Sequence, residues 1–106
     1  MKLTEYEIIM KINIARQKLE KNKNYICDHY HVKSMGIFGS FVRNELTKSS
    51  DIDILVQLEK GHKGFFNYIR LKFYLEELFG KEVDLVMKDA VKPRLKEKIF
   101  GEVIYV

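Results

Sequence analysis

Apolar residues in the first part of the chain recur at helical intervals. Thr4 and Glu7 stand before them with the spacing of a capping box, in which each residue's side chain bonds the other's backbone at a helix start. The apolar positions are Ile8, Ile9, Ile12 and Leu19. This pattern predicts a first helix of about twenty residues. The polar residues Asn22, Asn24 and Asp28 that follow predict that the helical pattern loosens there.

Two runs rich in β-branched and aromatic residues come next, and each predicts a strand. The first run contains Val32, Met35, Ile37 and Phe38, and it ends at Gly39. A short helix is then expected over 40–46, because Ser40 is a good N-cap residue, followed by a polar turn. The second strand is expected over 51–58, where apolar and polar side chains alternate at its start.

The second half of the chain continues the alternation of helix and strand. Apolar spacing predicts a helix over 65–79 that is closed by Gly80. A strand over 82–87 follows, then a short helix over 93–100 and a terminal strand over 103–106. This order favours an α/β or α+β fold, with a small mixed sheet of about four strands and helices packed on it.

Composition limits the class of protein. The 106 residues, 46% of them hydrophobic, suffice for one compact core, so we expect residues 1–106 to form a single domain. No apolar run approaches the roughly 18 residues of a membrane span, and the start lacks the apolar stretch of a signal peptide, so we expect a cytoplasmic protein. The single cysteine, Cys27, is expected to be a small buried hydrophobic residue rather than a reactive thiol.

The net charge of +4 allows an anionic partner but does not identify one. Lysines are interspersed with glutamates, which favours a mixed, solvated surface. Nucleic-acid binding depends on this net charge alone and is therefore disfavoured.

Three aspartates lie in predicted strands whose other face is apolar. Asp51 and Asp53 point to the same side because side chains alternate along a strand. If the strand of Asp84 lies beside theirs, three carboxylates converge, and their mutual repulsion calls for a cation. Mg²⁺ suits such a site because it takes carboxylate, phosphate and water oxygens. The alternative is a solvated pair at the start of an edge strand.

Gly39 and Ser40 lie between a predicted strand and a predicted helix start. Backbone amides at a helix N-terminus suit a phosphate, and glycine lets a ligand approach the backbone. Together with Asp51 and Asp53 after a ten-residue spacer, they supply amides for phosphates and carboxylates for the bridging metals. The sequence thus points to a nucleoside triphosphate site.

Other polar and aromatic residues suggest less specific chemistry. His29 and His31 have no cysteine or carboxylate at ligand spacing, so a zinc site is disfavoured. Tyr68 and Tyr74 in the predicted helix 65–79 are interpreted as packing residues at the edge of the core rather than base-stacking groups.

The segment GIFGSFVRNELTKSSDIDILVQL, followed by VDLVM, resembles the minimal nucleotidyltransferase (MNT) branch of the DNA polymerase β superfamily. The signature is Gly-Ser, about ten residues, Asp-x-Asp, and a third carboxylate on a later strand. The ending KPRLKEKIFGEVIYV is also similar to the closing helix and strand of that branch, so the resemblance covers almost the whole chain. It implies a palm-like nucleotidyltransferase core.

The resemblance also implies roles for individual residues. Gly39 and Ser40 would hold the triphosphate of ATP, and Asp51 and Asp53 would bind two Mg²⁺ ions. Asp84 would be the third metal ligand or the base for the attacking hydroxyl. Arg43 and Glu45 match an Arg-x-Glu of this branch, where Arg43 either contacts a phosphate or pairs with a carboxylate at the surface.

The expected function is the Mg²⁺-dependent transfer of a nucleoside monophosphate (NMP) onto a hydroxyl acceptor. The first candidate is AMP, with ATP as its donor. A chain of this length has no acceptor domain, so a partner, a second copy or a shallow surface must hold the acceptor. MNT proteins pair with small helical HEPN-domain proteins as antitoxin and toxin, and some adenylylate a tyrosine of that partner. The alternative is a binding module that neutralises a partner by occlusion, without catalysis.

Overall fold

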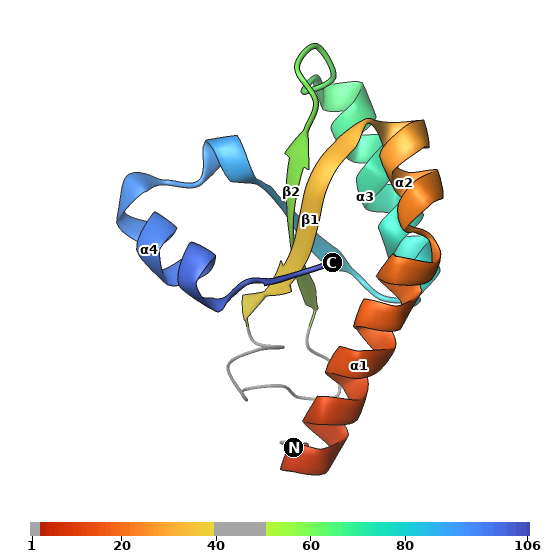
Figure 1. Ribbon diagram of the computed structural model, residues 1–106, viewed down its shortest axis with the longest axis vertical. Coiled ribbons are helices and arrows are strands. Elements are labelled where there is room, and N and C mark those ends of the chain that lie inside the picture. The colour runs from red at the N-terminus through yellow and green to blue at the C-terminus, as the bar shows by residue number, and fades with distance from the viewer. Residues whose placement is uncertain (1–2, 40–50) are drawn as a thin grey trace.

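The computed structural model describes residues 3–39 and 51–106 (Figure 1). The elements, in chain order, are α1 Glu5–Lys21, α2 Lys23–Tyr30, β1 Val32–Phe38, β2 Ile52–Leu58, α3 Phe65–Phe79, β3 Val83–Met87, the short 3₁₀ helix η2 Lys88–Ala90, α4 Pro93–Glu102 and β4 Ile104–Tyr105. The predicted short helix over 40–46 lies outside the described residues. The predicted mixed α/β fold with a small sheet covered by helices is confirmed.

The four strands form one mixed sheet in the order β3-β2-β1-β4. β1 runs antiparallel to both of its neighbours, β2 and β4. β2 and β3 run parallel, and α3 makes the crossover connection that parallel neighbours require. The end of β1 and the start of β2 therefore lie at the same edge of the sheet.

Helices cover both faces of the sheet. In Figure 1, α1, α2 and α3 lie on one side of the strands and α4 lies on the other. The main core lies under α1–α3, and its β2 residues are Ile52, Ile54, Val56 and Leu58. The opposite face of β2 contributes Leu55 to a smaller cluster with Phe38 and Val91, against which the half-buried Ile99 and Phe100 of α4 pack. Alternation along β2 thus directs its side chains in turn to the two faces of the sheet, each of which carries a hydrophobic cluster.

Local sequence explains where the helices begin and end. The capping box predicted at the N-terminus is present, since the Thr4 hydroxyl accepts from the Glu7 amide and the Glu7 carboxylate accepts from the Thr4 amide. α3 ends at Gly80, which is left-handed as the sequence predicts. α4 is longer than predicted and continues to Glu102.

The expectation that helical order loosens after Asn22 is wrong. Asn22 ends α1, where its side chain donates to the Lys18 carbonyl (2.8 Å), and its own carbonyl accepts from the Ile26 amide (2.9 Å) to begin α2. Ile26 and Tyr30 are one helical turn apart and both are buried, so packing stabilises α2 in spite of its polar residues.

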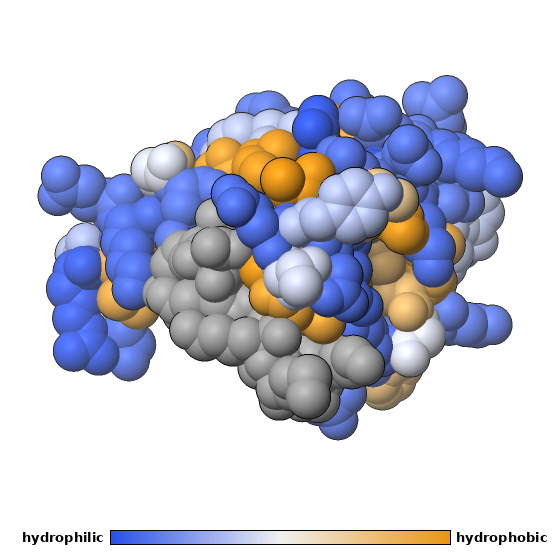
Figure 2. Space-filling view, turned by 90° about the horizontal axis from the view of Figure 1, so that it is seen from below, coloured by the Kyte–Doolittle hydropathy of each residue, from blue (hydrophilic) through white to orange (hydrophobic). Residues whose placement is uncertain are grey.

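The surface agrees with the expected mixture of polar and charged residues. Figure 2 looks at the end of the molecule where β1 finishes and β2 begins, and shows hydrophilic residues over much of it with separate hydrophobic patches. Among residues 3–39 and 51–106, no helix has both the length and the apolar character needed to span a lipid bilayer.

Candidate active site

Gly39 lies directly against the carboxylate of Asp53. Gly39 follows β1 with φ +77°, and a Cβ atom at this position would lie 2.0 Å from Asp53 Oδ2. Both the backbone conformation and this close approach require glycine. The contact brings the predicted phosphate-binding segment next to the predicted metal ligand.

Asp53 and Asp84 lie on neighbouring strands. They are register partners in the parallel pair of β2 and β3, so their Cα atoms are about 5 Å apart and their side chains share one face of the sheet. Asp53 is half-buried and Asp84 is exposed. Asp51, also exposed, precedes β2 by one residue and lies two residues before Asp53. The structure thus brings all three predicted carboxylates to one edge of the sheet.

Asp53 and Asp84 lie on the face that α4 covers. Leu55, two residues after Asp53 on the same side of β2, packs in the cluster under α4. A surface depression of about 300 Å³ borders Asp84 there. Its lining consists of Phe38, Asp84, Val86, Ala90, Val91, Lys92, Leu95 and Ile99. The largely apolar depression is of a size that can hold an aromatic ring beside the carboxylates.

Glu102 is a site residue that sequence reasoning did not identify. Its Oε1 accepts a hydrogen bond from the Gly39 amide at 3.3 Å, although the two residues are 63 positions apart. In the sequence, Glu102 belongs to the closing segment that resembles the family, but that resemblance does not distinguish Glu102 from its neighbours. Since the Gly39 amide already donates to an anionic oxygen, its direction also suits a phosphate oxygen.

A group of lysines lies at the start of β2. Lys11, Lys18 and Lys81 line a depression of about 170 Å³ together with Ile52, the residue after Asp51. Burial lowers the pKa of Lys81, and the charge of Lys11 lowers it further, while the charge of Asp51 acts in the opposite direction. Positive charge near Asp51 offsets part of the repulsion among the carboxylates.

Three predicted site residues, Ser40, Arg43 and Glu45, lie outside the described residues. The tyrosines of α3 behave as predicted packing residues: the Tyr68 hydroxyl donates to the Leu85 carbonyl at 2.6 Å, and Tyr74 packs against the main core. Cys27 is only half-buried rather than fully buried, and burial raises the pKa of its thiol, which disfavours the reactive thiolate as expected.

The histidines differ from the expectation. His29 stacks on Tyr25, whereas His31 lies beside Glu59 and His62. Sequence spacing offers His31 no carboxylate partner, but the fold brings Glu59 and His62 beside it. The partners come from the segment after β2, and the antiparallel pairing of β1 with β2 brings them to the start of β1.

Known proteins are similar to this chain over most of its length. The family described as "Nucleotidyltransferase domain" matches residues 19–106. A relative from Methanocaldococcus jannaschii, named as a protein adenylyltransferase, is 45% identical over 96 residues, which cover 90% of this chain and 97% of the relative. Protein adenylyltransferase MntA of Thermococcus cleftensis is 40% identical over 88 residues, covering 83% of this chain and 88% of that protein.

Solved structures share the fold. A structure described as a minimal nucleotidyltransferase has a TM-score of 0.68 and 33% identity, covering 83% of this chain and 92% of that chain. A toxin–antitoxin structure with AMP-PNP has a TM-score of 0.66 at 19% identity, covering 81% of this chain and 70% of that chain. A complex of tri-AMPylated Shewanella oneidensis HEPN toxin with its MNT antitoxin has a TM-score of 0.62 at 17% identity, covering 86% of this chain and 70% of that chain.

The family match, the relatives and the fold agree with one another. The chain belongs to the nucleotidyltransferase domain family, in its minimal nucleotidyltransferase branch, and is a nucleotidyltransferase enzyme.

Proposed function

We propose that this enzyme transfers AMP from ATP to a hydroxyl group of a HEPN-type partner protein and acts as the antitoxin of that partner. The observation that carries the proposal is the contact of Gly39 with Asp53, together with the pairing of Asp53 with Asp84. A phosphate-binding amide and metal-binding carboxylates at one edge are what transfer of a nucleotide requires.

Asp51, Asp53 and Asp84 would hold Mg²⁺. Asp53 and Asp84 share one face of the sheet, Asp51 lies two residues before Asp53, and the half-buried Asp53 lies against the Gly39 backbone, so this oxygen-rich set fits a hard cation. When bound, Mg²⁺ supplies charge neutralisation at the phosphates and acidifies the attacking hydroxyl. Lys81, whose charge interacts with that of Asp51, adds positive charge near the start of β2.

The reaction forms one bond and breaks one bond. The acceptor oxygen attacks the α-phosphorus of ATP, a new P–O bond forms, the bond to the β-phosphate oxygen breaks, and pyrophosphate leaves. The hydroxyl proton passes to a carboxylate, and Asp84 is the candidate because it is exposed toward an incoming acceptor. The Gly39 amide would exchange its hydrogen bond to Glu102 Oε1 for one to a phosphate oxygen, and together with Ser40 it would bind the triphosphate and align the leaving group.

The acceptor is proposed to be a partner's side chain because the depressions that the described residues form beside the carboxylates are shallow. Its structural relatives include a complex in which the HEPN toxin carries AMP. Reaction in the cytoplasm, where ATP is available, accords with this assignment. A second copy of the chain is the other possible holder of the acceptor.

The competing proposal is neutralisation of the partner by occlusion without chemistry. One experiment distinguishes catalysis from occlusion. The protein is incubated with its HEPN-type partner, Mg²⁺ and ATP labelled at the α-phosphate, and an Asp51→Asn/Asp53→Asn variant is treated in the same way. We expect labelled partner with the unmodified chain and loss of at least about a hundredfold in labelling with the variant, since catalysis depends on charge neutralisation.

A matched control is Asp28→Asn, which removes an exposed aspartate from α2. It should label the partner at the normal rate. If both the unmodified chain and the double variant inhibit the partner equally and neither transfers label, occlusion replaces catalysis as the function.

A further inference from the structure

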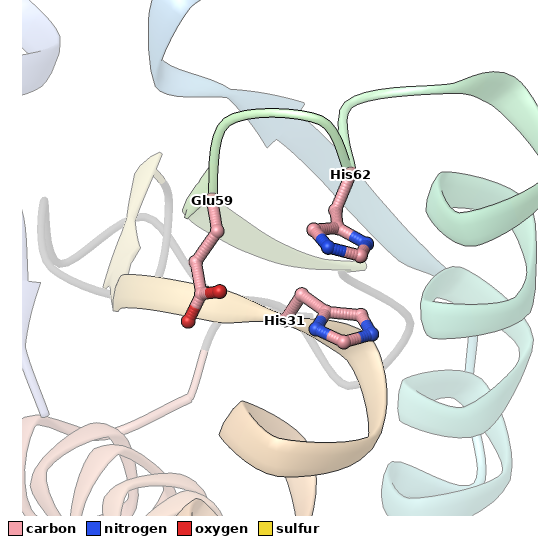
Figure 3. Close-up of side chains that lie close together, drawn as sticks. All are labelled: His31, Glu59 and His62. Carbon is pink, nitrogen blue, oxygen red and sulfur yellow. The ribbon is translucent and has the colours of Figure 1, made fainter.

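Two histidines and a glutamate cluster at the end of the β1–β2 pair that lies away from the carboxylates. His31 is the residue between α2 and β1, while Glu59 and His62 belong to the turn after β2 (Figure 3). Glu59 is exposed and His31 is half-buried, so the cluster is accessible from solvent. Glu59 is six positions after Asp53 along β2 and its continuation, which amounts to about 20 Å.

Backbone hydrogen bonds hold the three residues in place. The Glu59 amide donates to the His31 carbonyl at 2.8 Å, and the His62 amide donates to the Glu59 carbonyl at 3.0 Å. The second bond closes a turn that sets Glu59 and His62 side by side. At this end of the β1–β2 pair, three potential metal ligands therefore lie close together.

Asn67 of α3 strengthens this arrangement. Its side-chain amide donates to the Tyr30 carbonyl at 2.8 Å and to the His62 carbonyl at 3.0 Å. One side chain therefore ties the segment before His31 to the segment of His62. Asn67 therefore holds the backbone on which two of the three side chains are carried.

The ligand atoms are within reach of a single ion. One nitrogen of each histidine and one carboxylate oxygen of Glu59 all lie within 4.8 Å of one another. Ligands of a tetrahedral zinc ion are roughly 3.3 Å apart, given bonds of about 2.0 to 2.2 Å. The imidazole rings now stack at 3.6 Å between centroids with 15° between their planes. Binding would require the rings to turn about their side-chain bonds so that one nitrogen of each faces the ion.

We propose that His31, Glu59 and His62 bind a divalent transition-metal ion of the zinc class, with a fourth position left to water. Two imidazoles and one carboxylate favour zinc over Mg²⁺, which prefers oxygen ligands and retains its waters. The bound ion joins the α2–β1 corner to the β2–α3 loop. The site is separate from nucleotidyl transfer, and its test does not depend on that activity.

The experiment is a zinc titration by calorimetry in the Asp51→Asn/Asp53→Asn background, so that zinc at the other carboxylates does not contribute. We expect one ion per chain. His62→Gln and His31→Asn should each weaken binding by at least about tenfold, and Glu59→Gln should weaken it as well. Asparagine replaces His31 because residue 31 has φ 56°, a conformation that asparagine tolerates.

The chain offers two matched controls. His29→Gln removes the remaining histidine, which stacks on Tyr25, and Cys27→Ser removes the thiol; both should bind zinc normally. Equal affinity in His62→Gln and the parent, or loss of binding in either control, would overturn the proposal.

Cobalt gives a second measurement that does not depend on how well the variants fold. Co²⁺ in a four-coordinate site absorbs visible light much more strongly than octahedral Co²⁺. We expect strong absorption with the parent chain that zinc displaces. Weak, octahedral absorption would contradict the three-ligand site.

Discussion

At the scale of the residue, Gly39 determines where the Asp53 carboxylate can lie. We predict that Gly39→Ala lowers AMP transfer at least about tenfold, because the new Cβ would lie 2.0 Å from Asp53 Oδ2 and displace it. The positive φ of 77° adds backbone strain, so the free energy of unfolding should fall by about 1–3 kcal/mol. Labelled ATP measures the transfer, and urea unfolding measures the stability.

Gly61→Ala is the control for this substitution. Gly61 also has a positive φ, 86°, but a Cβ there meets no atom within 4 Å. It should lose stability through backbone strain while transferring AMP at the normal rate. Equal activity in Gly39→Ala and Gly61→Ala would show that the Gly39–Asp53 contact is not needed for the reaction.

At the scale of the element, two side chains of α3 fix the start of β3 and so the position of Asp84. Lys72 Nζ donates to the Glu76 carboxylate at 2.7 Å and to the Val83 carbonyl at 3.0 Å. The Glu76 carboxylate in turn accepts from the Val83 amide at 3.2 Å. Hydrogen bonds therefore link α3 to β3 at Val83, the residue before Asp84.

This junction predicts a dependence of stability on pH. Hydrogen bonds from Lys72 and from the Val83 amide hold the pKa of Glu76 below its usual value. A lowered pKa in the folded state stabilises the fold above the ordinary glutamate value, about 4.3, and this contribution is lost as the pH falls through the lowered pKa. We predict that Glu76→Gln is less stable than the parent at pH 7 and that the difference shrinks below about pH 4.

Urea unfolding of both proteins across this pH range measures the effect. Glu77→Gln, which changes the exposed neighbouring glutamate, provides the control and should follow the parent at every pH. A constant difference between Glu76→Gln and the parent from pH 7 to pH 3 would contradict the assigned cause.

Most elements could be predicted because their signals are local. The capping box at Thr4, the glycine at position 80 and the alternation over 52–58 each depend on neighbouring residues. α2 could not be predicted in this way, because its stability comes from burying Ile26 and Tyr30 against elements that are distant in sequence.

At the scale of the whole molecule, the same limit applies to the sites. Spacing alone places Asp51 and Asp53 on one side of a strand and singles out Asp84 on a later strand, and the family resemblance adds a role for each. Two further groupings could not be predicted from spacing. Glu102 meets Gly39 because the chain returns to the end of β1 through α4. His31, Glu59 and His62 meet because β1 pairs with β2. Local patterns therefore indicate a site within one element, whereas tertiary pairing determines which further residues join it.

The two ends of the β1–β2 pair should act independently. Asp53 and the His31–Glu59–His62 cluster are about 20 Å apart, and substitutions beyond about 10 Å without shared partners add within roughly 0.5 kcal/mol. We predict that the effects of Asp53→Asn and His62→Gln on the free energy of urea unfolding are additive in the double variant. His62→Gln should also transfer AMP at the normal rate, with or without zinc. Coupling above about 0.5 kcal/mol, or zinc-dependent transfer that His62→Gln abolishes, would show that the strands connect the two ends.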